Sequence, residues 1–219
     1  MYREFSTVAK TIDNIKAHYS KDSHIVLIRS TDDTTEYSSY LSCNKVIHLP
    51  DFSKLVKQYE IPSHAITRNY SAGFSYLYDT NIPFDYIVAL CGDTYVKDPS
   101  NFDRRFEDMK NRNKYICLSQ ALGQNFHSSN SNPDEGSEGG RFQHESITDF
   151  MPQFFMVDGR KAIETKVFSN MIITNKYTSE QCLGDELIDK FKTFDYAIRL
   201  AKNAYDYSDG IIYQHKENR

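Results

Sequence analysis

The chain has 219 residues, of which 39% are hydrophobic and 14% aromatic, enough to fill the core of one domain. Its 26 basic and 30 acidic side chains give a net charge of −4, so it lacks the basic field that nucleic-acid binding requires. No apolar run approaches the roughly 20 residues of a membrane-spanning helix, and the N-terminal MYREFSTVAK is not apolar enough for a signal peptide. We therefore expect a single domain over residues 1–219, which can belong to a longer protein, with no nucleic-acid partner and no transmembrane segment.

Helical periodicity alternates with short apolar runs through the first part of the chain. Ser6 can cap a helix that places Val8, Ile12, Ile15 and Tyr19 on one face. The expected elements, in chain order, are this first helix, strands at 24–28 and 45–49, a helix from Pro50 to Tyr59, a helix at 70–80 that Gly73 weakens, and a strand at 85–90.

The same alternation continues to the end of the chain. The expected elements are a helix at 101–112, strands at 115–119 and 153–157, helices at 179–192 and 194–205, and a strand at 210–214. Strands that are apolar along their whole length and alternate with helices are typical of a sheet buried on both faces. The sequence therefore predicts an α/β fold with a largely parallel sheet between two helical layers.

Residues 122–146 interrupt this alternation of predicted helices and strands. They hold four of the nine glycines and almost no aliphatic residue. A long segment without periodicity inside a compact domain is usually a functional lid or a disordered insert. We expect a mobile loop here, and both interpretations remain open.

The four cysteines are Cys43, Cys91, Cys117 and Cys182. They form no CxxC pair, and two of them lie in apolar strand-like runs. This pattern favours reduced core cysteines over disulfides or zinc ligands, as expected of a cytoplasmic protein.

Polar side chains follow two of the predicted strands. Asp93 comes just after the strand at 85–90, and Ser30, Thr31, Asp32 and Asp33 follow the strand at 24–28. In open α/β sheets, ligands bind outside the carboxyl ends of the strands. Carboxylates at such an edge suit Mg²⁺ or Mn²⁺, with substrate phosphates completing the coordination shell. The alternative for Asp93 is an aspartate that only caps the following turn.

Five motifs occur in an order that is more specific than any one of them. They are IRSTDDT (28–34), RNYSAGFSYLYDTNI (68–82), DYIVALCGDTYV (85–96), PQFFMVDGRKAI (152–163) and CLGDELIDKF (182–191). Together they resemble the GT-A class of nucleotide-sugar glycosyltransferases, and specifically glycosyltransferase family 2-like enzymes. The resemblance covers most of the chain and implies a GT-A-like fold with a Rossmann-like nucleotide-binding architecture.

The resemblance also implies an activity, namely transfer of a sugar from a nucleoside-diphosphate donor to a glycan or lipid-linked acceptor, with inversion and with Mn²⁺ or Mg²⁺. By analogy with the family motifs, Asp93 and His215 would bind the metal, and Asp185 or Glu186 would be the general base. The donor-binding residues implied in the same way are Ser30, Thr31, Asp32, Arg68, Asn69 and Gly92.

Two features differ from the family pattern. The usual DxD motif is reduced to Cys91-Gly92-Asp93, and the usual first strand has no counterpart before MYREF. A non-catalytic sugar-nucleotide-binding module is therefore an alternative. A nucleotidyltransferase is a second alternative because it shares a similar sheet, although we find no glycine-rich, basic phosphate loop after the first strand.

Overall fold

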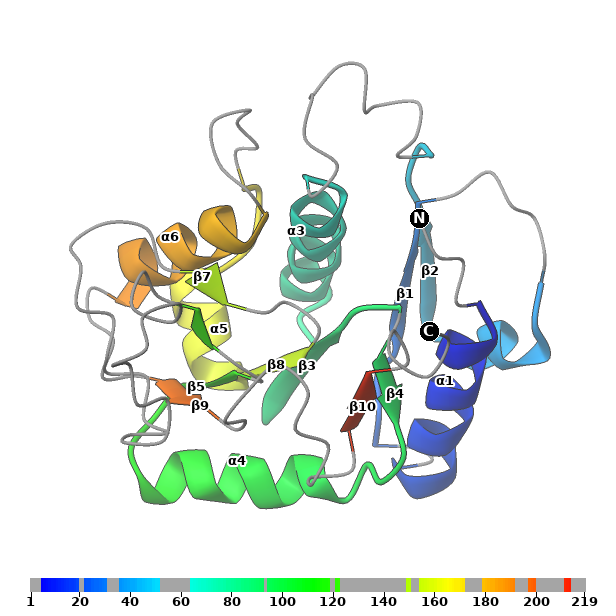
Figure 1. Cartoon of the computed structure of the whole chain (residues 1–219), viewed down its shortest axis with the longest axis horizontal. Helices are drawn as coiled ribbons and strands as arrows, with labels where there is room; N and C mark the ends of the chain where they lie inside the picture. The colour runs from blue at the N-terminus through cyan, green and yellow to red at the C-terminus, as the bar shows by residue number, and fades with distance from the viewer. Residues whose placement is uncertain are drawn as a thin grey trace, which may run out of the picture.

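The structure is a computed structural model in which the chain forms a mixed α/β fold (Figure 1). It describes residues 5–19, 22–30, 36–51, 64–92, 94–118, 121–122, 149–150, 154–171, 179–191, 197–199 and 211–213. The first elements are α1 (Phe5–Tyr19), β1 (Val26–Arg29), the 3₁₀ helix η1 (Ser38–Ser42), β2 (Lys45–His48), α3 (His64–Asp79), β3 (Tyr86–Leu90), β4 (Thr94–Val96) and α4 (Asn101–Asn111). They are followed by β5 (Ile116–Leu118), β6 (Ala121–Leu122), β7 (Asp149–Phe150), β8 (Phe154–Asp158), α5 (Gly159–Thr165), α6 (Ser179–Phe191), β9 (Ala197–Arg199) and β10 (Ile211–Tyr213).

The largest sheet has the strand order β3-β8-β5-β9. Strand β8 runs antiparallel to both of its neighbours, whereas β5 and β9 are parallel. A separate parallel pair joins β1 to β2, and antiparallel pairs join β4 to β10 and β6 to β7. The expected largely parallel sheet is therefore wrong for the described strands. No helix is described between β5 and β8, and parallel neighbours need a crossover connection, usually a helix.

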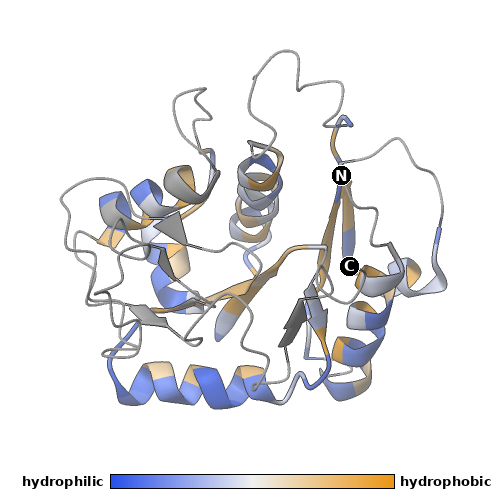
Figure 2. Cartoon of the chain, viewed as in Figure 1, coloured by the Kyte–Doolittle hydropathy of each residue, from blue (hydrophilic) through white to orange (hydrophobic). Residues whose placement is uncertain are grey.

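Two apolar layers enclose the central sheet because β8 is buried on both faces. Phe155 and Val157 belong to one cluster, with side chains of α3 and α6, and Phe154 and Met156 belong to another, with side chains of α4. Figure 2 shows the hydrophilic side of α4 turned away from the sheet. The sequence-based prediction of helices on both faces of a buried sheet is confirmed for this part of the chain.

The β1–β2 pair packs against α1 and η1 in a separate apolar cluster. Ala9 and Ile12 of α1 pack with Tyr40 of η1, and partly buried residues of β1 complete this cluster. Arg29, at the end of β1, is buried; it pairs with Glu36 and lies over the ring of Tyr40.

Most of the predicted elements that fall within the described residues are confirmed, with shifted boundaries. Helix α3 begins at His64, earlier than the predicted helix at 70–80, and residues 197–199 form a strand where a helix at 194–205 was expected. Hydrogen bonding to β5 stabilises that strand, and a local helical pattern cannot reveal such pairing. The helix predicted from Pro50 to Tyr59 lies mostly outside the described residues, as does the predicted loop at 122–146 apart from Leu122.

The four cysteines are free thiols, two of them buried and two partly buried, as predicted. Among the described residues, no helix combines the length and the apolar character needed to cross a membrane.

Two helical glycines give a matched stability test. A methyl group at Gly73 would lie 3.5 Å from Ile28 Cδ1, an ordinary contact, whereas one at Gly159 would lie 2.0 Å from the backbone oxygen of Phe84. We expect Gly73→Ala to raise the free energy of unfolding by about 0.5–1 kcal/mol through helix propensity. Gly159→Ala should lower it by about 3 kcal/mol, because β3 and the start of α5 would have to separate. Urea denaturation of both variants checks this, and equal stabilities would contradict the described packing of α5 on β3.

Candidate functional site

The carboxyl ends of β1 and β3 meet beside the N-terminal half of α3. The side chain of Asn69 donates a hydrogen bond from Nδ2 to Oγ of Ser30, just after β1, over 3.0 Å. The next residue of α3, Tyr70, has its hydroxyl 3.3 Å from Sγ of Cys91, just after β3. Since Asn69 and Tyr70 are adjacent, these contacts bring the two strand ends to one place.

The amino ends of the same strands lie at the other end of α3. His24, shortly before β1, stacks on Tyr76 with the ring centroids 6.3 Å apart. Strand β3 begins at Tyr86, soon after α3 ends at Asp79. Strands β1 and β3 therefore point the same way, and α3 runs antiparallel to both.

The described donor-binding candidates are brought together only in part. Ser30 and Asn69 are in contact, and Gly92 follows Cys91 at the same strand end, where an added methyl group would lie 3.5 Å from Val8 Cγ2 of α1. Arg68 instead donates from Nη2 to the backbone oxygen of Pro50 over 2.9 Å, which ties α3 to the segment after β2. Thr31 and Asp32 lie outside the described residues.

Both metal-ligand candidates, Asp93 and His215, also lie outside the described residues. Their nearest described neighbours along the chain, Thr94 and Tyr213, are opposite each other in the antiparallel pair of β4 and β10. Within the described part of the chain, no group of three His, Cys, Asp or Glu residues could hold a metal ion.

The two candidate bases on α6, Asp185 and Glu186, differ in their surroundings. Glu186 accepts a hydrogen bond from the backbone N–H of Phe168 over 3.2 Å, and Lys190 Nζ lies 3.8 Å from the same carboxylate oxygen. Burial raises the pKa of Glu186, and the nearby Lys190 partly offsets this rise. Phe168 has a positive φ of 62°, so this carboxylate holds an unusual backbone turn. We assign Glu186 a structural role.

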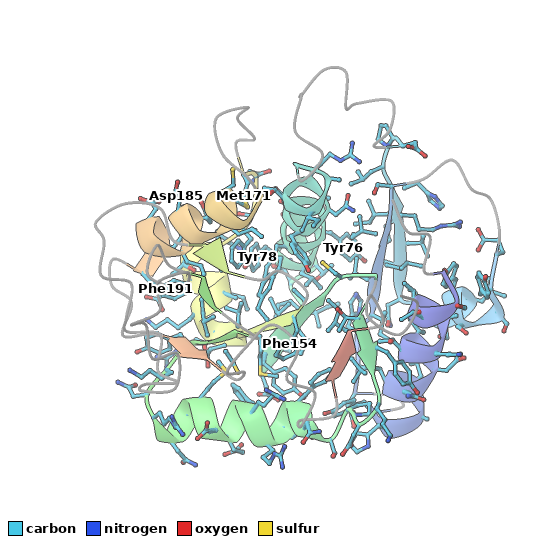
Figure 3. The ribbon with its side chains drawn as sticks, in the orientation of Figure 1. Tyr76, Tyr78, Phe154, Met171, Asp185 and Phe191 are labelled. Carbon is cyan, nitrogen blue, oxygen red and sulfur yellow. The ribbon has the colours of Figure 1, made fainter. Side chains whose placement is uncertain are left out.

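Asp185 is the better candidate for a general base. It is half-buried, burial raises its pKa, and its carboxylate has no hydrogen bond or ion pair with the described part of the chain. Figure 3 shows Asp185 towards the periphery of the molecule, on α6, with Phe154 near the centre. Helix α6 contacts α3, and Met171 N donates to Ser71 Oγ of α3 over 3.0 Å. No described hydrogen bond joins Asp185 to Ser30 or Gly92.

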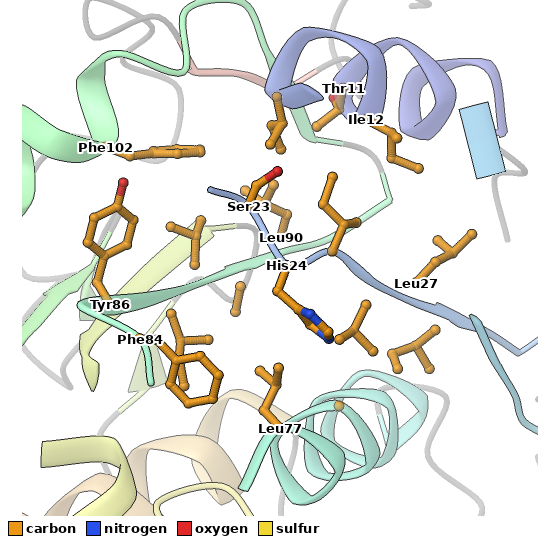
Figure 4. A pocket seen from close by; sticks show the side chains of 18 of the residues that line it. Thr11, Ile12, Ser23, His24, Leu27, Leu77, Phe84, Tyr86, Leu90 and Phe102 are labelled. Atoms are coloured by element: carbon orange, nitrogen blue, oxygen red, sulfur yellow. The ribbon is translucent and has the colours of Figure 1, made fainter. Parts of the chain in front are cut away.

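A cavity of about 590 Å³, which sequence reasoning missed, lies between α1, β1, α3 and β3 (Figure 4). Apolar side chains predominate in its lining, and the labelled ones include Ile12, Leu27, Leu77, Phe84 and Leu90. It also reaches the donor-binding candidates Asn69 and Gly92, so one of its ends coincides with the candidate site. Exposed lining residues such as Asp22, Asp85 and Gly92 show that it opens to the surface.

Because this cavity opens to the surface, water can enter it, and its mainly apolar lining favours an apolar occupant over that water. Three buried polar atoms in its lining, Ser23 Oγ, His24 Nε2 and Asn69 Oδ1, have no hydrogen-bond partner among the described residues. Burial, with the nearby charge of Lys16, lowers the pKa of His24, so its imidazole is neutral at pH 7. The cavity is therefore suited to a mainly apolar occupant with a few hydrogen-bonding groups.

The role of Glu186 can be tested by two substitutions. Glu186→Ala leaves the N–H of Phe168 without its acceptor and should lower the free energy of unfolding by about 1–3 kcal/mol. Glu186→Gln keeps an acceptor and should cost less. Folding raises the pKa of Glu186 above its ordinary value of 4.5, so the protonated carboxyl favours the folded state. The free energy of unfolding of the parent should therefore fall as the pH rises from 4.5 through the pKa of Glu186 in the folded protein. Gln cannot titrate, so the fall should become smaller when the variant is unfolded in urea between about pH 4 and pH 7, with a remainder from Asp185, whose pKa burial also raises. Equal losses for Ala and Gln would contradict the assignment.

Comparison of the chain with protein-family models and with curated proteins found no match.

Proposed function

We propose that the chain is a nucleotide-sugar glycosyltransferase domain whose donor binds at the carboxyl ends of β1 and β3, in a variant of the GT-A arrangement. The observation that carries this proposal is the Ser30–Asn69 hydrogen bond beside the Tyr70–Cys91 contact. Three of the sequence motifs meet there, at the edge where open α/β sheets bind their ligands.

The chemistry of this edge suits a nucleoside. Asn69 Oδ1 is buried and has no partner among the described residues, so it can accept a hydrogen bond from a ribose hydroxyl or a base N–H. Ser30 Oγ, which accepts from Asn69, keeps its own proton to donate. In this proposal Thr31 and Asp32 complete the nucleoside contacts. Arg68 binds a phosphate of the donor only if its guanidinium releases the backbone oxygen of Pro50.

The proposed metal ligands are Asp93 and His215, supported by the pairing of Thr94 with Tyr213. An Mn²⁺ or Mg²⁺ ion bound there would neutralise charge on the departing nucleoside diphosphate. The backbone N–H of Thr94 donates to Cys91 O over 3.0 Å, which ties the start of β4 to the end of β3.

We assign Asp185 the role of the base that removes the proton of the acceptor hydroxyl. A carboxylate whose pKa is raised by burial holds that proton better than an exposed one, which favours general-base catalysis. The acceptor, a glycan or a lipid-linked sugar, would have to lie between α6 and the donor edge. A non-catalytic module would bind the donor without transfer, and the two predictions below separate these functions.

The donor edge is tested by binding. We expect thermal-shift measurements with UDP, GDP and their sugar conjugates to give an increase in midpoint that depends on Mn²⁺. Asn69→Ala should raise the dissociation constant at least about tenfold, because it removes the acceptor and releases Ser30. Asn111→Ala, at the exposed end of α4, is the matched control and should leave binding unchanged. A response to no nucleotide, or equal binding by both variants, would refute the donor site.

Catalysis and metal binding are separated by two isosteric substitutions. Asp93→Asn keeps its size and turn-capping ability but loses its charge, so Mn²⁺-dependent donor hydrolysis should fall by about 10²–10³. Asp185→Asn should leave donor binding intact and lower transfer by about 10²–10⁴. If the Asp93 variant responds to Mn²⁺ as the parent does, that residue only caps a turn. Donor binding without transfer by the parent would favour the binding module.

A further inference from the structure

A histidine joins the start of β1 to α3 at the amino end of the cavity. The imidazole of His24 stacks on the ring of Tyr76, with the centroids 6.3 Å apart and the ring planes 21° from parallel. Figure 4 shows this imidazole turned towards α3, beside Leu77. At the other end of β1, Asn69 of α3 is bonded to Ser30. Strand β1 is therefore held to α3 at both ends, and His24 makes the contact at the amino end.

The position of this imidazole suits its neutral form. Nε2 of His24 is buried and has no hydrogen-bond partner among the described residues, although the cavity that it lines opens to the surface. A protonated imidazole carries an N–H on both nitrogens, so Nε2 would become a buried, charged donor without an acceptor. A charged group left without a partner costs more free energy than a neutral one. Protonation of His24 therefore opposes the stacked position.

Two lysines add to this effect. Lys16 Nζ of α1 donates a hydrogen bond to the backbone oxygen of Ser23, the residue before His24, over 3.3 Å. Lys45 Nζ of β2 lies over the same ring of Tyr76 on which His24 stacks, 5.6 Å from its centroid. Since that ring already attracts one cation, a second cation beside it would be repelled by the first.

The acidic groups at this end of the cavity do not offset the lysines. Asp22, Asp85 and Asp103 line the cavity, but Asp22 and Asp85 are exposed, and Asp103 accepts a hydrogen bond from Tyr86 over 2.6 Å. Among the described residues, no acid forms an ion pair with His24. Solvent screens the attraction between an exposed carboxylate and the imidazole. Burial, followed by the charge of Lys16, accordingly lowers the pKa of His24 below its ordinary value of 6.5.

We propose that His24 is an acid-sensitive contact, whose protonation separates the start of β1 from α3 and opens the amino end of the cavity. The charged imidazole can reach water only by leaving the ring of Tyr76, because Nε2 is enclosed in the stacked position. The opening is local, since the backbone N–H of Ile25 stays bonded to Asn44 Oδ1 over 2.8 Å and keeps β1 beside β2. Histidine is the side chain whose charge ordinarily changes in the physiological pH range. The inference does not depend on the proposed function.

The direction of the pH effect follows from the two states of the chain. Folding lowers the pKa of His24, so the unfolded chain binds this proton more tightly. The contribution of His24 to the free energy of unfolding is therefore present above pH 6.5 and is lost as the pH falls from 6.5 through the pKa of the folded protein. Asp185 and Glu186, whose pKa values burial raises, contribute in the opposite sense. A variant that differs from the parent only at His24 separates the two effects.

The test compares the parent with His24→Gln, which is polar and cannot be protonated. Between about pH 7.5 and about pH 5.5, the urea midpoint of the parent should fall relative to that of the variant. His48→Gln, at the exposed end of β2, is the matched control and should behave as the parent does. In hydrogen exchange at the lower pH, the amides of β1 should lose protection in the parent and keep it in His24→Gln, whereas those of β8 should stay protected in both.

The same pH dependence in the parent and His24→Gln would refute the acid-sensitive contact, as would an equal change in His48→Gln. Loss of protection in β8 together with β1 would mean global unfolding and would also overturn the inference. If a thermal scan shows that His24→Gln is unfolded, an NMR titration of the parent takes its place. The Cε1–H resonance of His24 and the amide resonances of β1 should then shift with one midpoint below 6.5. A midpoint at or above that value, or β1 resonances that do not follow His24, refutes the proposal.

Discussion

Four consecutive side chains of β8, Phe154 to Val157, are completely excluded from solvent, and the arrangement of the other elements follows from their burial. Successive side chains of a strand point to opposite faces, so this strand needs an apolar layer on each side. Helices α3 and α6 supply one layer and α4 supplies the other. Because β3 pairs with one edge of β8 and β5 with the other, β3 lies at the border of this sheet among the described strands.

Helix α3 connects this sheet to the β1–β2 pair. Its N-terminal half contacts the residues that follow both β1 and β3, and Tyr76 contacts the segment before β1. The helix thereby aligns two strands that are not hydrogen bonded to each other. A methyl group at Gly73 would lie 3.5 Å from Ile28 Cδ1, so the helix and β1 are at ordinary packing distance there. The same alignment produces both the polar edge at Ser30 and Asn69 and the apolar cavity below it.

The sequence predicted the elements whose residue pattern is determined by burial. It could not predict the features that depend on contacts between residues far apart in the chain. The continuous apolar runs at 85–90 and 153–157 predicted β3 and β8 because both faces of these strands are covered. Residues 197–199 were predicted to be helical, and their pairing with β5 is a non-local fact that no window of sequence contains. Likewise, Asp185 and Glu186 are equivalent in sequence as adjacent acids, and only the structure shows that Phe168 N and Lys190 lie beside Glu186. The cavity has no sequence signature, since its volume depends on how separate elements pack.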